Sequence, residues 1–123
     1  MNCEVLIAGA GIVGLSTAYQ IQLKFPDIKI VVLEKESEVA FHQTGHNSGV
    51  MHSGIYYKPG SYKATNCIRG YNMLLEFCEQ QQINYQLIGK LIIASKENEL
   101  DRLKTIYNNG IQNGLTHLTL LTK

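Results

Sequence analysis

Six residues near the N-terminus, Gly9-Ala10-Gly11-Ile12-Val13-Gly14, constrain the fold of this chain more than any other feature. They follow a short apolar run at residues 4–8 and precede a segment whose apolar residues recur at helical spacing until Pro26. A second apolar run, residues 28–34, ends in Glu34. This order predicts a strand, a tight glycine turn, a helix and a second strand, which is a β-α-β unit over residues 1–34.

Each glycine of the G-x-G-x-x-G pattern has a separate physical role. Gly9 permits the tight turn, Gly11 lets the backbone approach a pyrophosphate, and Gly14 lets the helix pack closely on the strand. The helix N-terminus then offers unpaired N–H groups to the anion. Glu34 can accept hydrogen bonds from ribose hydroxyls, and its charge disfavours the 2′-phosphate of NADP, so NAD or FAD is expected. The alternative is a glycine-rich turn with Glu34 merely solvated at a strand end.

The composition excludes several classes of protein. The chain has 123 residues, 45% of them hydrophobic and 17% charged, and its net charge of +1 argues for one globular domain that does not bind nucleic acid. Cys3, Cys67 and Cys78 form no C-x-x-C pair, which indicates neither a disulfide framework nor a zinc site. We expect a cytoplasmic protein without a signal peptide or transmembrane segment, which meets a membrane, if at all, at its periphery.

The remainder of the chain begins with an aperiodic stretch, residues 35–60, that is rich in glycine and histidine. Such a stretch is typical of a functional loop or of a set of short elements. Beyond it, the patterns predict a helix over 61–82, one or two strands over 85–95, a helix from a Ser95 cap to Asn113-Gly114, and a strand over 115–121.

Residues 42–57 read H-Q-T-G-H-N-S-G-V-M-H-S-G-I-Y-Y, and the strand end before them reads L-E-K-E. Both segments resemble the L-2-hydroxyglutarate oxidase (dehydrogenase) family, FAD enzymes related to D-amino-acid oxidase. The resemblance implies an α/β fold, namely the N-terminal part of a Rossmann-like FAD-binding domain. The β-α-β unit would be followed by a flavin-contacting segment at 35–60 and by the helix-strand-helix start of the remaining fold at 61–123.

The resemblance implies FAD as the cofactor and assigns a set of residues to it. Glu34 would bind the adenine ribose, Thr44 would lie near the pyrophosphate, and residues 47–50 would pass along the isoalloxazine. The full set of predicted cofactor-binding residues is Gly9, Gly11, Ile12, Val13, Gly14, Glu34, Lys35, Thr44, Asn47, Ser48, Gly49 and Val50. Hydroxyl and amide side chains between glycines suit such contacts.

Two histidines, His46 and His52, are candidates for the catalytic base, since neutral imidazole can accept a proton near pH 7. The sequence does not distinguish between them, and a core role for His52 is an equal alternative. A metal site at His42, His46 and His52 is disfavoured because no cysteine or carboxylate completes it nearby. No metal ligand is therefore predicted.

By resemblance, the reaction is oxidation of L-2-hydroxyglutarate to 2-oxoglutarate by hydride transfer to flavin, with oxygen or a membrane quinone as electron acceptor. The 2-hydroxy-acid substrate needs cationic partners, which near the motifs are Lys58, Lys63, Arg69 and Lys90. One alternative is an NAD-dependent dehydrogenase. Another is an inactive fragment, or one piece of a split flavoenzyme whose C-terminal part is separately encoded. Because the strand at 5–8 would expose an unpaired edge, we expect the isolated chain to be at best marginally folded and to bind FAD weakly or not at all.

Overall fold

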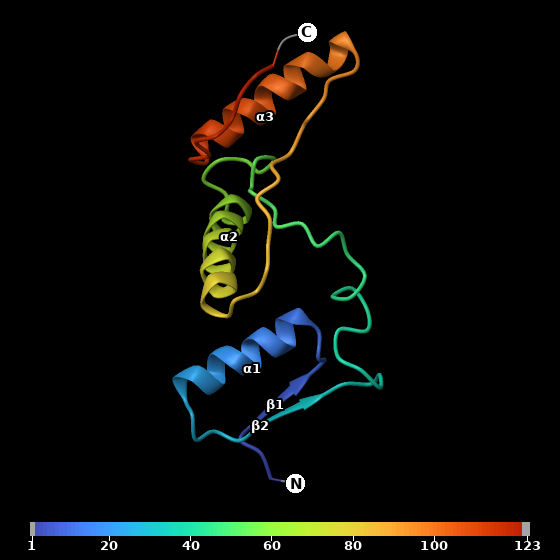
Figure 1. The fold of residues 1–123 in the computed structure, drawn as a ribbon, viewed down its shortest axis with the longest axis vertical. Coiled ribbons are helices and arrows are strands. Elements are labelled where there is room, and N and C mark those ends of the chain that lie inside the picture. Colours follow the sequence, from blue (N-terminus) through green and yellow to red (C-terminus); the bar gives the residue numbers. More distant parts are fainter. Residues whose placement is uncertain (1, 122–123) are drawn as a thin grey trace. The chain divides into compact units, whose positions relative to one another are not determined.

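The computed structural model describes residues 2–121, which form two compact units, one up to Gly49 and the other from Val50 onward. The first unit contains strand β1 (Val5–Ala8), helix α1 (Ile12–Lys24) and strand β2 (Ile30–Leu33). The strands are parallel, with Val5 opposite Ile30 and Ala8 opposite Leu33, and α1 packs against both of them (Figure 1). The predicted β-α-β order is thus confirmed.

Strand β2 begins later than the apolar pattern predicts. The N–H of Ile28 donates to the carbonyl of Phe25 at 3.2 Å, which closes a turn around Pro26. Residue 28 therefore belongs to the turn, and pairing with β1 starts at Ile30. Beyond the strand pair, Gly9 N–H donates to the carbonyl of Leu33 at 2.7 Å, so the parallel pairing continues into the glycine turn.

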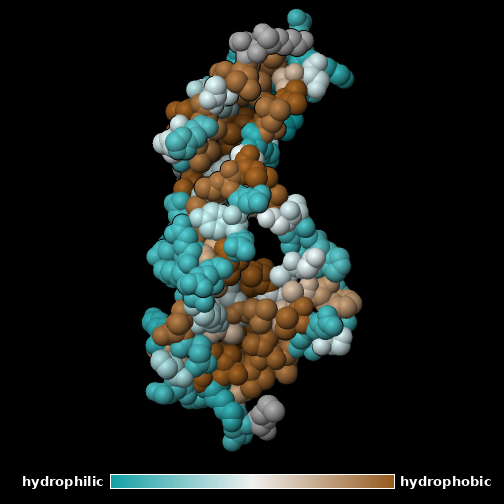
Figure 2. Space-filling model, viewed as in Figure 1, coloured by the Kyte–Doolittle hydropathy of each residue, from teal (hydrophilic) through white to brown (hydrophobic). Residues whose placement is uncertain are grey.

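The apolar surface of the strands is poorly covered. Leu6 is 58% exposed and Leu33 is 54% exposed, and Figure 2 shows apolar surface over the region of the two strands. Among residues 2–121, the buried hydrophobic residues are Ala10, Ala64 and Cys78. A two-stranded sheet with so few buried side chains gains little from the hydrophobic effect.

The second unit contains helix α2 (Tyr62–Gln80), a short 3₁₀ turn η1 (Glu97–Glu99) and helix α3 (Leu100–Gln112). Helix α2 confirms the prediction for 61–82. The Ser61 hydroxyl oxygen accepts the Ala64 N–H at 3.2 Å, the N-cap contact that satisfies one of the free N–H groups of a first turn. The helix ends just before Gln82, whose φ of 55° lies in the left-handed region.

The predicted strands at 85–95 and 115–121 are wrong, because both segments are irregular as far as Leu121. A strand exists only where a second strand pairs with its backbone, and within the part of the chain described here no ladder reaches either segment. Gly89, at φ 73°, also interrupts the extended backbone of the first segment. The apolar side chains that suggested a strand are largely exposed, with Ile88 at 82%.

The predicted Ser95 cap is also wrong. The carboxylate of Glu99 accepts the N–H groups of Ser95 at 2.7 Å and Lys96 at 3.2 Å, and Ser95 is a donor in this contact. A glutamate that reaches back to the N–H groups before a helix replaces the serine cap. Helix α3 consequently begins at Leu100, after η1, and it ends where predicted, at Asn113 and Gly114.

Residues 52–57 lie between α2 and α3 in the second unit. The side-chain Nδ2 of Asn113 donates to the backbone carbonyls of Gly54 at 3.2 Å and Tyr57 at 2.9 Å. On the other side, the Cys67 thiol donates to the carbonyl of His52 at 3.2 Å. The buried Gly110 admits this segment, because a Cβ there would lie 3.1 Å from Ile55.

Within residues 2–121, the helices are either too short or too polar to cross a membrane.

Candidate functional site

The glycine turn of the first unit joins β1 to α1 through a very close backbone approach. Gly9 has a φ of 101°, which L side chains rarely adopt. A Cβ added at Gly14 would overlap the carbonyl oxygen of Gly9 and would lie 3.3 Å from the Ile7 side chain. The first turn of α1 therefore sits on the glycine turn only because residue 14 has no side chain.

Glu34 follows β2 and turns its carboxylate back to the glycine turn. One oxygen, Oε2, accepts the N–H of Ala10 at 2.7 Å. The other, Oε1, accepts the N–H groups of Lys35 at 2.9 Å and Glu36 at 3.1 Å. A carboxylate has about four acceptor positions, so Oε2 keeps a lone pair for a further donor such as a ribose hydroxyl.

These hydrogen bonds lower the pKa of Glu34 below the ordinary value of 4.5. The Ala10 N–H is the largest cause, the Glu36 N–H is next, and smaller contributions come from the Lys35 N–H and the nearby His42, while partial burial opposes them. Because the folded pKa is depressed, the contribution of Glu34 is present above pH 4.5 and is lost as pH falls through the lowered value. The carboxylate is therefore bound to the turn throughout the neutral range.

This arrangement predicts a coupled titration of Glu34 and Ala10. In a carbon-detected NMR titration, the Glu34 side-chain carboxyl should have its midpoint below 4.5, and the Ala10 amide shift should follow the same midpoint. A Glu34→Gln chain serves as the control, since its Ala10 amide should not respond over that range. A Glu34 midpoint at or above 4.5 would contradict the geometry.

Thr44 lies at the N-terminus of α1, although it is far along the sequence. Its Oγ1 accepts the N–H of Ile12 at 2.9 Å, and a Cβ at Gly11 would lie 3.2 Å from the same oxygen. Within residues 2–121, the N–H groups of Val13 and Gly14 have no hydrogen-bond partner. Two donors at the positive end of a helix are suited to an anionic group such as a pyrophosphate.

The segment after Thr44 folds on itself through its own side chains. Asn47 donates from Nδ2 to the carbonyls of Gln43 at 3.0 Å and Thr44 at 2.7 Å, and its Oδ1 accepts the Gly49 N–H at 2.7 Å. Gly49 has a φ of 63°, a conformation that glycine adopts without strain. Ser48 is exposed. Asn47 thus shapes the backbone of the predicted flavin-contacting residues.

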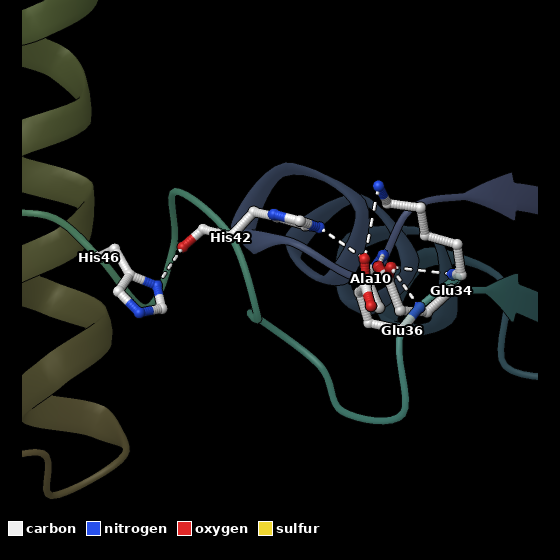
Figure 3. A network of polar contacts seen from close by, with 6 residues as sticks. Ala10, Glu34, Glu36, His42 and His46 are labelled. Carbon is white, nitrogen blue, oxygen red and sulfur yellow. Dashed lines mark hydrogen bonds and ion pairs between the residues drawn. The ribbon is translucent and has the colours of Figure 1, made fainter.

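His46 has a defined ring orientation. Its Nδ1 lies 2.9 Å from the carbonyl oxygen of His42 (Figure 3). A carbonyl can only accept, so Nδ1 carries the proton and, in the neutral ring, Nε2 keeps its lone pair. The second candidate, His52, is exposed and belongs to the second unit, as does Val50. In the same unit, the ammonium of Lys90 lies 4.5 Å from the ring centroid of Tyr56.

The structure adds residues that sequence reasoning missed. Ala10 is only 3% exposed. Its N–H donates to the Glu34 carboxylate, and its carbonyl accepts the Ala40 N–H at 3.0 Å. Glu36 accepts from the ring Nε2 of His42 at 2.9 Å (Figure 3). The Lys35 ammonium lies 3.4 Å from the same carboxylate. The motif includes His42, but no periodicity in the sequence connects it with Glu36.

The first unit therefore brings together the glycine turn, Glu34, Lys35 and Thr44. The open N–H groups, the remaining acceptor position of Glu34 and the lack of a Cβ at Gly9 and Gly11 fit the phosphate and ribose groups of FAD. Within the described part of the chain, no three histidine, cysteine, aspartate or glutamate side chains are grouped so as to hold a metal ion.

Comparison with known proteins relates nearly the whole chain to flavoenzymes. The family model described as FAD dependent oxidoreductase matches residues 4–123. An L-2-hydroxyglutarate dehydrogenase from Indibacter alkaliphilus is 52% identical over 115 residues, which cover 94% of this chain and 29% of that protein. The mitochondrial L-2-hydroxyglutarate dehydrogenase of Homo sapiens is 51% identical over 118 residues, 96% of this chain and 26% of that protein. The mitochondrial L-2-hydroxyglutarate dehydrogenase of Dictyostelium discoideum is 49% identical over 118 residues, again 26% of its length.

The chain thus spans between 26% and 29% of the length of these relatives. The match to the family model, by contrast, covers nearly the whole chain and includes the glycine turn, Glu34 and the segment of Thr44. By sequence and by the geometry of its β-α-β turn, this chain belongs to the FAD dependent oxidoreductase family.

Proposed function

We propose that the chain forms the FAD-binding part of a flavoenzyme that oxidises L-2-hydroxyglutarate to 2-oxoglutarate. The observation that carries the proposal is the conjunction of the glycine turn, Glu34 and Thr44 at one helix N-terminus in a chain about half identical to L-2-hydroxyglutarate dehydrogenases. Since the chain spans less than a third of those relatives, the reaction would use this chain together with the remaining part of the fold.

Different residues of the chain would bind different parts of FAD. The N–H groups of Val13 and Gly14 would bind the pyrophosphate, beside the Thr44 hydroxyl, and the open lone pair of Glu34 would accept from the adenine ribose. Lys35 donates its backbone N–H to the Glu34 carboxylate, and its ammonium pairs with the neighbouring Glu36. The backbone of residues 47–50, shaped by Asn47, would follow the flavin ring.

The chemistry requires a proton acceptor and a hydride acceptor. When bound, FAD supplies the acceptor for the hydride that leaves C2 of the substrate. The hydroxyl proton would go to Nε2 of His46, because Nδ1 of that ring is already held by a carbonyl oxygen. His52 is the second candidate base, and Lys90 is a candidate partner for a substrate carboxylate.

Oxygen or a membrane quinone would reoxidise the flavin. The Homo sapiens and Dictyostelium relatives are named as mitochondrial, whereas the location proposed for this chain is the cytoplasm or the periphery of a membrane.

The test is to produce the chain together with the part of the Indibacter relative that it does not match. We expect a yellow complex whose flavin absorbance bleaches anaerobically with L-2-hydroxyglutarate and not with the D-enantiomer. A His46→Gln chain should keep the colour and bleach about a hundredfold more slowly, since a general base contributes on that order. A His52→Gln chain is the matched comparison for the base assignment. A colourless complex would refute FAD binding, and a yellow complex inert to L-2-hydroxyglutarate would refute the substrate.

A further inference from the structure

Residues 34–47 contain no helix or strand, yet their backbone is held in a defined conformation. Ala40 has a φ of 61°, a left-handed conformation that costs a residue with a Cβ and persists only where its surroundings enforce it. Its N–H donates to the carbonyl of Ala10 at 3.0 Å. This segment is therefore fastened to the glycine turn in its middle as well as at Glu34 and Thr44.

Glu36 and His42, both in this segment, contact each other through their side chains. The ring Nε2 of His42 lies 2.9 Å from Oε1 of Glu36, and the Lys35 ammonium lies 3.4 Å from the same oxygen. The Glu36 side chain is 29% exposed, compared with 56% for His42 and 74% for Lys35. Glu36 is thus the more buried partner in both contacts, and its own N–H donates to Glu34.

The contact at His42 is transmitted to Thr44 through the backbone. The His42 carbonyl accepts the Gly45 N–H at 3.1 Å and Nδ1 of His46 at 2.9 Å, so the turn that carries Thr44 begins at His42. That turn packs against Ala40 tightly enough that a Cβ at Gly45 would lie 2.6 Å from the Ala40 carbonyl oxygen. A change in the position of His42 therefore moves both Thr44 and His46.

We propose that Glu36 and His42 are a pair of positioning residues, whose contact holds Thr44 at the N-terminus of α1 and so shapes the pyrophosphate-binding end of the cofactor site. This inference rests on the proposed function, because it concerns the same site. The Glu36 side chain contacts the Lys35 ammonium, and both Glu36 and His42 act on Thr44 through the turn at residues 42–45. The pair is thereby distinct in role from Glu34, which bonds to the glycine turn itself.

The conformation of the turn can be measured without the cofactor. In the ¹⁵N-labelled full chain at 5 °C, the Ile12 amide reports directly on its hydrogen bond to Thr44. We expect Glu36→Ala and His42→Ala each to accelerate exchange of the Ile12 amide about tenfold, and the double variant to show no further acceleration, since both remove the same contact. Glu36→Gln, which keeps an acceptor oxygen, should restore slow exchange. Glu38→Ala, an exposed carboxylate of the same segment, is the matched control and should have no effect.

Added FAD separates this inference from the proposed function. In the complex with the part of the Indibacter relative that this chain does not match, the FAD dissociation constant can be read from FAD-induced shifts of the Val13 and Gly14 amides. If the pair positions the site, this constant should rise about fivefold in both alanine variants and recover in Glu36→Gln. Unchanged Ile12 exchange in both alanine variants, or additive effects in the double variant, would overturn the inference whether or not FAD binds. A normal response of Ile12 with no FAD-induced shift in the wild-type complex with that complementary part would instead count against the proposed function.

Discussion

Replacing Gly14 with alanine should abolish flavin binding, whereas the same replacement at Gly70 should leave it intact. Both glycines lie inside helices, Gly14 in α1 and Gly70 in α2. A Cβ at Gly14 would overlap the Gly9 carbonyl oxygen, which is backbone and cannot rotate away. A Cβ at Gly70 would meet nothing within 4 Å. The two variants therefore differ in steric consequence and not in helix propensity.

The expected magnitudes follow from this difference. To relieve the overlap, the first turn of α1 must move away from the glycine turn, at a cost of about 3 kcal/mol or more, which is the upper end for overpacking. The Val13 and Gly14 N–H groups and the Ile12 contact to Thr44 would be displaced together. Gly70→Ala should instead stabilise α2 by roughly 0.5–1 kcal/mol, because alanine loses less backbone entropy in a helix.

The measurement is flavin retention by the complex with the complementary part of the Indibacter relative, together with ¹⁵N spectra of each chain at 5 °C. For Gly14→Ala we expect a colourless complex and displaced amide signals from residues 9–15, with the signals of α2 unchanged. If Gly14→Ala kept its flavin and its wild-type spectrum, the close packing of the glycine turn would be wrong.

Sequence reasoning succeeded where structure is determined locally. The β-α-β unit was predicted from apolar periodicity and glycine spacing, and α2 was predicted from its apolar repeat over 61–82. Each of these patterns is contained in the segment that forms the element. The predicted strand at 85–95 failed because a strand depends on a partner elsewhere, which the run of apolar residues does not specify. The same reasoning accounts for residues 115–121.

The candidate site divides in the same way. The contact between Glu34 and the glycine turn could be predicted, because a dinucleotide-binding turn has its glycines and its acid at fixed separations in the sequence. The contact between Thr44 and Ile12 spans 32 residues, and that between Glu36 and His42 lies in an aperiodic loop. Such contacts depend on the conformation with which the loop returns to the glycine turn. The types of the side chains alone do not specify that conformation. The orientation of His46, likewise, is set by a backbone carbonyl.

The isolated chain should melt in a broad, weakly cooperative transition at low temperature and should retain little FAD. Its accessible surface is 10415 Å², whereas two separate compact domains of the same total mass would expose about 8,000 Å². Among residues 2–121, large apolar side chains such as Leu87 and Leu91, each 68% exposed, contribute to this excess. Burial of apolar area is the main favourable term in folding, so an excess of this size leaves little to offset the loss of conformational entropy.

Adding the complementary part of the Indibacter relative should raise both the thermal stability and the FAD retention of the chain. A partner that binds only the folded state stabilises that state. At a hundredfold excess over the dissociation constant, the gain of about 2.7 kcal/mol should raise the melting midpoint by roughly 10 °C or more and sharpen the transition. Circular dichroism and flavin fluorescence would follow the two effects in one titration, with the Gly14→Ala chain as the control that gains no flavin. A sharp melting transition and tight FAD binding by the chain alone would contradict this expectation, because they would require a core larger than Ala10, Ala64 and Cys78 provide.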